Sequence, residues 1–142
     1  KMPDGGYAVG GFSYSGMDGD KTSANHGFSD YYILRTDSLG NKLWDRSYGT
    51  GGYETMWSMC VASDGGFLLA GHTSAGADGD KTEASRGGSD YWVVRLDPQG
   101  NKLWDKRYGG TSSEGLLDAK PCMDGGFILT GYSTSYAGGD KT

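Results

Sequence analysis

Hydrophobic and polar positions along the chain follow a pattern that returns every 60 residues. Within one period, four short segments rich in apolar residues cover residues 54–63, 67–73, 90–97 and 102–108. The third of them is rich in aromatic and β-branched residues, which favours β-strands. Between the second and third segments lies a long polar stretch, residues 74–89. The pattern therefore predicts four strands per period, with one long loop.

Whole motifs recur at the same offset. Asp-Gly-Gly occupies 4–6, 64–66 and 124–126, Gly-Asp-Lys-Thr occupies 19–22, 79–82 and 139–142, and Gly-Asn-Lys-Leu-Trp-Asp occupies 40–45 and 100–105. Internal repeats imply that each unit needs its neighbours in order to bury its faces. We expect one repeat segment over residues 1–142, with units at approximately 1–50 (partial), 51–110 and 111–142 (partial).

The third predicted strand is apolar on both faces. Tyr91 and Val93 lie on one side of it, and Trp92, Val94 and Leu96 lie on the other. A sheet with one wet face would alternate more cleanly, so each sheet is expected to be covered on both sides by its neighbours. Radially stacked blades of about 40 to 50 residues have this property. The fold class predicted is all-β, with four-stranded antiparallel blades in a partial β-propeller, and a stacked-sheet β-solenoid-like array is the alternative.

The length sets the number of units. Dividing 142 residues by the 60-residue period gives about 2.4 blades, whereas closed propellers have at least about four. We expect either a piece of a longer chain, with the remaining blades in that chain, or self-association into a ring or stack.

Composition and charge exclude several classes of protein. The 27 glycines have no Gly-X-Y period, and the 13% aromatic content exceeds that of disordered chains. The net charge of −5 argues against nucleic acid as a partner. No apolar run approaches the roughly 20 residues that span a bilayer, so no membrane insertion is expected.

The combined motifs resemble a known class of repeats. They are the segments at 64–74, 79–83, 89–97 and 100–110, and the resemblance extends over essentially the whole chain. It is to the propeller-like repeats of large secreted proteins from Bacteroidetes-type bacteria, which often end in a sorting domain for type IX secretion. The resemblance implies an extracellular or cell-surface location and a non-enzymatic repeat region, and it provides no catalytic residues.

The long loops contain the best candidate site. Asp18-Gly19-Asp20 and Asp78-Gly79-Asp80 each place two carboxylates around a glycine. Calcium prefers such hard oxygen ligands, so calcium is the candidate cofactor, although the EF-hand pattern is absent. The alternative is that these aspartates form side-chain-to-backbone turn bonds that keep the loop ordered.

Loops on a rigid scaffold are where binding usually occurs, so we predict the long-loop edge as the surface for a protein or glycan partner. The same loop offered once per blade would bind with avidity. Aromatic residues that recur in each unit are expected to pack between blades, whereas non-repeated ones are better candidates for a specific contact. The predicted binding residues are Asp18, Asp20, Lys21, Asp78, Asp80, Lys81, Tyr14 and Tyr136.

The remaining chemistry points away from catalysis. His26 and His72 do not repeat, and no Gly-x-Ser-x-Gly nucleophile elbow is present. Cys60 and Cys122 are expected to be two buried free thiols. We therefore expect a non-catalytic binding or scaffold module. A structural subunit of a surface assembly or fibre, and an extracellular enzyme such as a glycoside-active propeller, are the alternatives.

Overall fold

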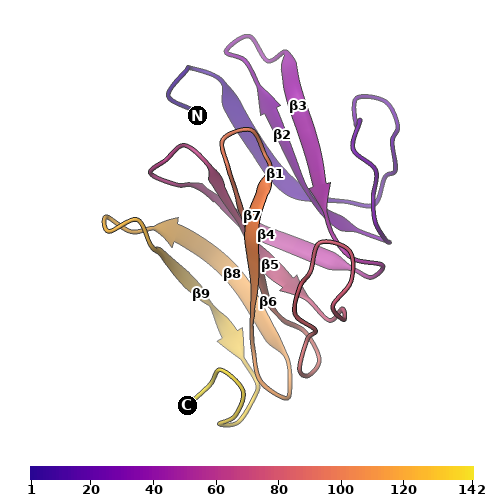
Figure 1. Cartoon of the computed structure of the whole chain (residues 1–142), viewed down its shortest axis with the longest axis vertical. Coiled ribbons are helices and arrows are strands. Elements are labelled where there is room, and N and C mark those ends of the chain that lie inside the picture. Colours follow the sequence, from indigo (N-terminus) through magenta and orange to yellow (C-terminus); the bar gives the residue numbers. More distant parts are fainter.

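The computed structural model describes residues 1–142 and is built of nine strands joined by turns and loops (Figure 1). It has no helix that is long and apolar enough to cross a membrane. The strands are β1 (Tyr7–Ser13), β2 (Asp30–Thr36), β3 (Lys42–Tyr48), β4 (Glu54–Val61), β5 (Phe67–Thr73), β6 (Asp90–Leu96), β7 (Lys102–Tyr108), β8 (Glu114–Pro121) and β9 (Phe127–Ser133).

The strands form three antiparallel sheets in sequence order. The first sheet has the order β1-β2-β3, the second β4-β5-β6-β7 and the third β8-β9. The middle sheet is the complete 60-residue unit, and the outer two hold the equivalent strands at an offset of 60. The all-β class and the four antiparallel strands of one period are thus confirmed. The predicted strands over 54–63 and 90–97 are slightly too long, because they end at Val61 and Leu96.

A β-bulge interrupts the first strand of the unit in both of its copies, β4 and β8. The pairing of β4 with β5 shifts between Met56 and Ser58, and that of β8 with β9 shifts between Leu116 and Asp118. The extra residue of each bulge points to solvent, with Trp57 56% exposed. A bulge of this kind redirects one side chain out of the sheet, which explains an exposed tryptophan within a core strand.

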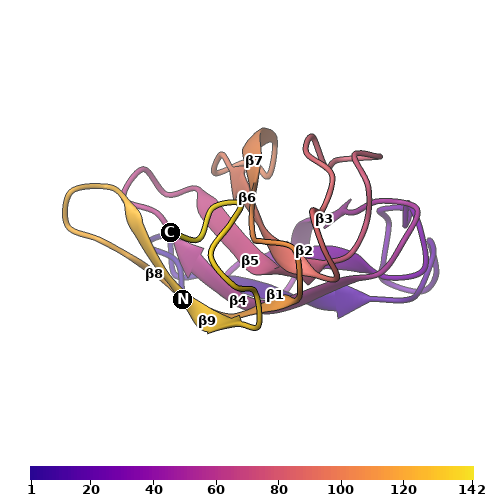
Figure 2. The same ribbon diagram turned by 90° about the horizontal axis from the view of Figure 1, so that it is seen from below.

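The sheets pack on one another through their first strands. β4 contacts β1 and β2 of the preceding sheet and is itself in contact with β8. Figure 1 and the view from below in Figure 2 both show β4 between β1 and β8. We call the contact between the first and second sheets the first junction, and that between the second and third sheets the second junction.

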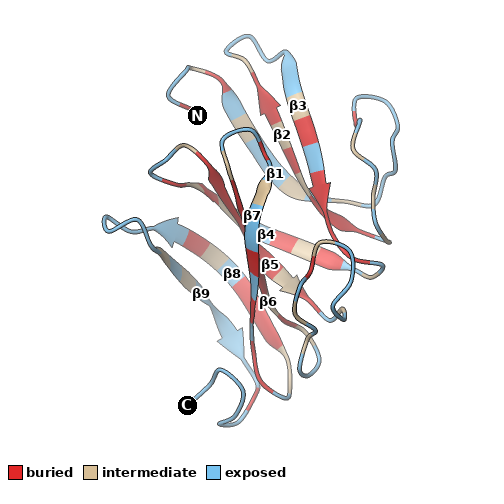
Figure 3. Cartoon of the chain, in the orientation of Figure 1, coloured by how far each residue is buried: buried red, intermediate tan, exposed pale blue.

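Each face of the middle sheet contributes to a hydrophobic core. Trp92, Val94 and Leu96 of β6 are buried in the first junction, and Val93 is buried in the second, with Tyr91 packed beside it. The prediction that the third strand is apolar on both faces is confirmed. Buried positions concentrate in the middle sheet, and exposed ones cover most of β9 and much of β1 (Figure 3).

The recurring aromatic residues and the cysteines show the effect of position in the array. Tyr31 and Tyr48 are buried in the first junction, as expected, but Tyr108, which is equivalent to Tyr48, is 42% exposed.

Cys60 is buried and both thiols are free. The expectation that Cys122 is also buried is wrong, because β8 ends before it and Cys122 lies exposed in the following turn.

Candidate functional site

The long loops fold around their lysines. Lys81 is buried, and its ammonium group donates hydrogen bonds to the backbone carbonyls of Ala75 and Glu83 and to the hydroxyl of Ser85. Burial lowers the pKa of Lys81. Lys21 makes similar contacts within the first loop. Both predicted binding lysines therefore direct their ammonium groups into their own loops.

A buried aspartate in the last strand of the unit anchors the same loop. Asp105 accepts hydrogen bonds from the backbone N–H of Thr82 (2.9 Å), the indole N–H of Trp92 (3.0 Å) and the ammonium group of Lys102 (3.1 Å). Burial opposes the charge of Asp105, but these donors outweigh it and hold its pKa below the usual value. Asp45 anchors the first loop in the same way.

The aspartates of the second loop bind the preceding unit. The backbone N–H of Asp80 donates to the carbonyl of Gly49 (2.8 Å), and the N–H of Gly49 donates back to Oδ2 of Asp80 (3.1 Å). Beside it, the N–H of Gly51 donates to Oδ2 of Asp78 (2.9 Å). We call the reciprocal Asp80–Gly49 pair of hydrogen bonds the clasp, because it ties the loop of one unit to the strand end of another.

The clasp recurs at the second junction and has no partner in the first unit. Asp140 and Gly109 exchange the same two hydrogen bonds, at 3.2 and 3.1 Å. The carboxylates of Asp18 and Asp20 make no such hydrogen bonds. In the second loop both aspartates accept backbone hydrogen bonds from the preceding unit, and in the third copy, where Gly138 replaces the first aspartate, Asp140 alone does so.

Four exposed aromatic residues lie outside the strands, Tyr14, Phe28, Tyr53 and Tyr136. Tyr14 is 67% exposed and lies edge-on to Phe12, and Tyr136 is 91% exposed. Phe28 and Tyr53 stack with ring centroids 4.7 Å apart, and both are more than half exposed. Tyr14 and Tyr136, both predicted binding residues, are therefore free to meet a partner, although the two lie in different units.

A pair of buried carboxyl groups lies in each junction, next to the clasp. Asp30 and Glu54 form the pair in the first junction, and Asp90 and Glu114 form it in the second. Oδ1 of each aspartate is buried and has no hydrogen-bond partner outside the carboxyl pair. Gly109 packs against the second pair, since a Cβ built on it would lie 2.3 Å from Oδ1 of Asp90 and 2.7 Å from Oε2 of Glu114.

The pKa values of the two carboxyl groups in the second pair shift in opposite directions. Burial raises the pKa of Asp90, and its hydrogen bond to the carboxylate of Glu114 raises it further. Burial also opposes the charge of Glu114, but hydrogen bonds from the hydroxyl of Ser135 and the N–H of Gly110 keep its pKa below the usual value. Two carboxyl groups in contact cannot both ionise cheaply, so the more solvated or better bonded one takes the charge.

The positive groups around the two pairs differ. In the first junction, His26 contacts Asp30 of the carboxyl pair and Asp80 of the clasp. Its Nδ1 lies 3.1 Å from Asp30 and its Nε2 lies 3.6 Å from Asp80. In the second junction, the guanidinium of Arg86 stands at the equivalent position and lies 2.9 Å from Asp140. A histidine ring in one junction thus replaces an arginine guanidinium in the other.

Sequence reasoning did not find the carboxyl pairs or the anchoring aspartates. The signal was present, because Glu54 and Glu114 recur at an offset of 60, as do Asp45 and Asp105. A recurring acidic residue inside an apolar strand is itself unusual, since buried carboxyl groups require partners. The partner of Glu54, however, is Asp30 on a strand 24 positions earlier, and only the packing of the sheets brings the two together.

The first pair has no access to a substrate, because Asp30 and Glu54 are both 0% exposed. At the second junction, a cavity of about 250 Å³ reaches Glu114 and is lined also by Tyr91, Tyr108 and Ser133. The arrangement ties neighbouring units together. It does not present two free carboxyl groups to a solvent-borne ligand.

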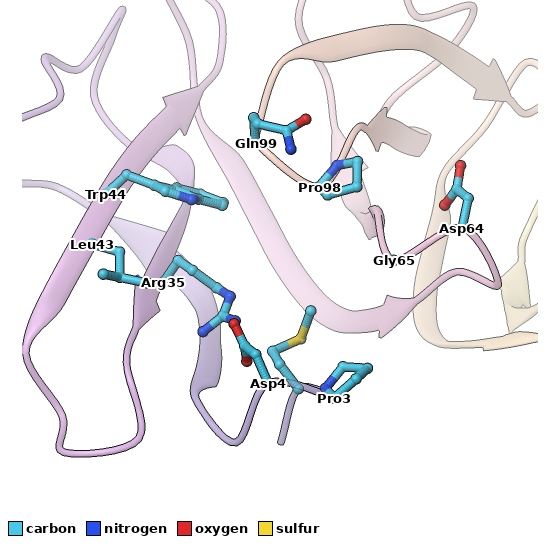
Figure 4. Close-up of a pocket in the computed structure, with 10 residues that line it drawn as sticks. Pro3, Asp4, Arg35, Leu43, Trp44, Asp64, Gly65, Pro98 and Gln99 are labelled. Atoms are coloured by element: carbon cyan, nitrogen blue, oxygen red, sulfur yellow. The ribbon is translucent and has the colours of Figure 1, made fainter.

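A wider cleft of about 410 Å³ opens at the opposite edge of the first junction, among the short turns (Figure 4). Trp44 of the first unit forms one wall, and Pro98 and Gln99 of the second unit lie across from it. Arg35 lines the floor, but its guanidinium is already bound to Asp4 (2.5 Å). The sequence did not predict this cleft, because its walls come from different units.

Comparisons with known proteins give little further guidance. No family model matches the chain. It is 33% identical over 93 residues to the regulatory protein FlaEY of Caulobacter vibrioides, an alignment that covers 62% of this chain and 10% of that protein. The chain therefore spans about a tenth of the length of the curated relative it matches.

Proposed function

We propose that this chain is part of a β-propeller of repeated four-stranded blades that acts as a non-catalytic binding or scaffold module. Two features support a radial arrangement. Neighbouring sheets meet through their first strands, β4 with β8, while the outer strands β3 and β7 share no extended contact. Sheets that converge at one edge and diverge at the other are the geometry of propeller blades.

The clasp is the observation that carries the binding proposal. It fixes the second long loop at both ends, to Asp105 within its own unit and to Gly49 of the preceding one. This loop is therefore held firmly, and ordered loops on a rigid scaffold suit recognition. The exposed rings of Tyr14, Phe28 and Tyr53 belong to this edge.

The asymmetry of the aromatic residues supports a specific contact at the first unit. Phe28 and Tyr53 correspond to Gly88 and Ser113 one period later in the sequence, so the repeat does not need rings there. We propose that a glycan or protein partner contacts these rings, since exposed aromatic rings stack on sugar rings and also anchor protein interfaces. We further propose an extracellular or cell-surface location, in line with the resemblance to secreted repeats.

The test replaces two rings by the residues found one period later, Ser74 for Tyr14 and Ser113 for Tyr53. We expect the double variant Tyr14→Ser, Tyr53→Ser to lose at least tenfold in affinity for a bound glycan on an immobilised glycan panel, or for a purified surface protein. Tyr132→Ser, an exposed tyrosine on β9, is the matched control and should bind as the parent chain does. If the parent chain binds no member of either panel, or if the control variant loses as much as the double variant, the proposal fails.

Calcium binding by Asp18, Asp20, Asp78 and Asp80 stays a prediction. Asp78 and Asp80 already accept backbone hydrogen bonds, so a cation there would compete with the clasp, whereas Asp18 and Asp20 have free carboxylates. A calcium-induced rise in melting temperature that EDTA reverses and Asp18→Asn reduces would support it. An unchanged melting temperature would rule it out.

A second candidate function is supported by the outer face of the first sheet. Tyr7 and Val9 of β1 are 45% and 55% exposed, although their equivalents Phe67 and Leu69 are fully buried between sheets. An apolar sheet face of this kind favours self-association. Sedimentation of the parent chain and of Val9→Asp tests it: a surface-assembly subunit forms concentration-dependent oligomers that the variant abolishes.

A further inference from the structure

The cleft among the short turns of the first junction is the largest cavity of the chain, and the loop-edge proposal does not involve it. Its volume of about 410 Å³ lies within the range of about 300–1,000 Å³ that is typical of small-molecule sites. Turn residues of both units surround it, and the ring of Trp44 extends from β3 across it toward Pro98 (Figure 4). We call this cavity the Trp44 cleft.

The indole ring of Trp44 is half-buried and is held in place by its neighbours. One edge packs on the backbone of Gly100, where an added Cβ would lie 2.9 Å from Cζ3 of the ring. Phe67 lies edge-on to the ring, with centroids 6.0 Å apart, and the guanidinium of Arg46 lies 5.8 Å from the ring centroid. The hydroxyl of Tyr48 donates to the carbonyl of Gly100, which ties the turn across the cleft to β3. The cleft therefore has a preformed aromatic wall.

Every charged group that lines the cleft is already paired within the chain. Asp4 lies 2.5 Å from the guanidinium of Arg35, and Asp64 lies 2.7 Å from that of Arg95. The two arginine side chains are only 7% and 9% exposed, so neither offers a free site for an anion. Arg46 already provides a cation beside the aromatic ring. The charges of the cleft balance, and its walls favour a neutral ligand.

The two carboxylates of the cleft can still accept hydrogen bonds from a ligand. The hydrogen bond from Arg35 lowers the pKa of Asp4. The hydrogen bond from Arg95 lowers the pKa of Asp64 in the same way, so both groups are ionised at neutral pH and cannot donate. A carboxylate has about four lone-pair sites, and Asp4 uses two of them, for Arg35 and for the N–H of Gly6. The two aspartate side chains are 61% and 56% exposed, so a ligand that brings donors can reach them.

The wall across from the indole ring combines an apolar ring with an amide. Pro98 and Gln99 are both exposed, and the amide of Gln99 can donate and accept. The turn is ordered, because Asp97 accepts the backbone N–H of Gln99 (2.9 Å). The equivalent turn of the first unit has Ser38 and Leu39 at these positions, so the repeat does not require this wall.

A neutral saccharide matches this set of groups. A sugar ring has apolar CH faces that stack on an aromatic ring, and hydroxyl groups around its rim that donate to carboxylates. A purely apolar ligand would desolvate the carboxylates without replacing their hydrogen bonds to water, and a charged ligand would find no free countercharge. We propose that the Trp44 cleft binds a neutral saccharide, with a sugar ring stacked on Trp44 and its hydroxyl groups donating to Asp4 and Asp64. This site is separate from the aromatic rings of the loop edge.

Titration calorimetry of the intact chain with neutral oligosaccharides tests the proposal. The probes are cellohexaose, xylohexaose, mannohexaose and maltohexaose, and we expect at least one of them to bind saturably with a dissociation constant of about 1 mM or lower. Choline and inorganic phosphate, a small cation and a small anion, should not bind. In a two-dimensional NMR spectrum, the indole N–H signal that Trp44→Phe removes should shift during the oligosaccharide titration.

Protein variants locate the binding to the cleft. Trp44→Ala should weaken oligosaccharide binding at least tenfold, because it removes the stacking wall. Trp57→Ala removes an exposed indole ring outside the cleft and is the matched control, which should bind as the parent chain does. Gln99→Ala, in an exposed turn, is the second cleft variant if Trp44→Ala does not fold, and it should weaken binding severalfold.

The outcomes separate this site from the loop-edge function. The proposal is overturned if no oligosaccharide binds, if choline or phosphate shifts the Trp44 indole signal, if binding survives the cleft variants, or if Trp57→Ala weakens binding as much as Trp44→Ala. The double variant Tyr14→Ser, Tyr53→Ser should leave cleft binding unchanged. If that variant loses oligosaccharide binding and Trp44→Ala does not, the saccharide belongs to the loop edge, which overturns the cleft proposal and supports the proposed function.

Discussion

The carboxyl groups of Asp90 of β6 and Glu114 of β8 are both buried against Gly109 at the second junction. The pKa of Asp90 is raised by burial and by the neighbouring carboxylate, and the pKa of Glu114 is lowered by the hydroxyl and backbone donors around it. Oδ1 of Asp90 has no other partner. The contact between two repeat units therefore includes a group whose charge depends on pH.

Asp90→Asn should reduce the dependence of stability on pH. The folded-state pKa of Asp90 lies above the usual value of 3.8, so the stability from this proton is fully present below pH 3.8 and is lost as the pH rises through the folded pKa. An asparagine keeps a donor toward Glu114 at every pH. Urea denaturation at several pH values between about 3 and 8 measures the difference. The variant should lose less stability than the parent chain across this range. Identical slopes of the unfolding free energy against pH would contradict a raised pKa for Asp90.

Asp105→Asn should weaken the protein at neutral pH and flatten its acid denaturation. The pKa of Asp105 is lowered, so its stabilisation is present above the usual value of 3.8 and is lost as the pH falls through the folded pKa. Hydrogen bonds to a charged group contribute about 1.5–3 kcal/mol, and we expect a loss of that order at pH 7. Chemical denaturation tests it, with Asp124→Asn, an exposed turn aspartate, as a control that should change little.

Gly79→Ala and Gly19→Ala should separate the clasp from backbone strain. Both glycines have φ of +54°, so an alanine is strained equally at each, by about 1 kcal/mol or more. A Cβ at Gly79 would lie 2.3 Å from the carbonyl of Gly49, whereas a Cβ at Gly19 meets nothing within 4 Å. Gly79→Ala should therefore lower the melting temperature clearly more than Gly19→Ala does. Equal decreases in melting temperature for the two variants would mean that the contact between the loop and Gly49 does not contribute to stability.

Tyr31→Phe should cost more than Tyr91→Phe. Tyr31 is fully buried and donates to the carbonyl of Trp92, so its removal leaves a buried acceptor unpaired, at about 1–3 kcal/mol. The longer bond of Tyr91 is in an exposed setting, and its loss should change the free energy of unfolding by less than about 0.5 kcal/mol. The pair of variants is compared by urea denaturation, and a loss at Tyr91 as large as that at Tyr31 would refute this difference between the junctions.

Local features of the fold were predictable because they depend on neighbours in sequence. The hairpin turn over 97–101 follows from its proline, glycine and asparagine, and Asp97 accepts the backbone N–H groups of Gln99 and Asn101 as such turns require. The strands at 67–73 and 102–108 have the predicted bounds. The offset of 60 likewise predicted three equivalent sheets, because recurring residues take up recurring structure.

Features that join residues of different units were not predictable from one period. The sequence shows Asp80 only as a carboxylate in an acidic loop, and its role depends on Gly49 lying 2.8 Å from its backbone N–H. The buried state of Lys81 depends in the same way on how its loop closes. Tyr108 is exposed, whereas its equivalent Tyr48 is buried in the core that Trp92 and Val94 of the next sheet help to form.

The sequence by itself determined the repeat, the strands and the two-sided apolar character of the third strand, because periodicity and side-chain type act locally along the chain. Only the tertiary structure decided which carboxylates bind backbone, which are buried in pairs and which stay free. These outcomes depend on the few ångströms between one sheet and the next, and that spacing is set when the hydrophobic faces pack. The Asp-Gly-Asp loop thus appears in the sequence as a candidate ligand set and in the structure as the tie between successive units.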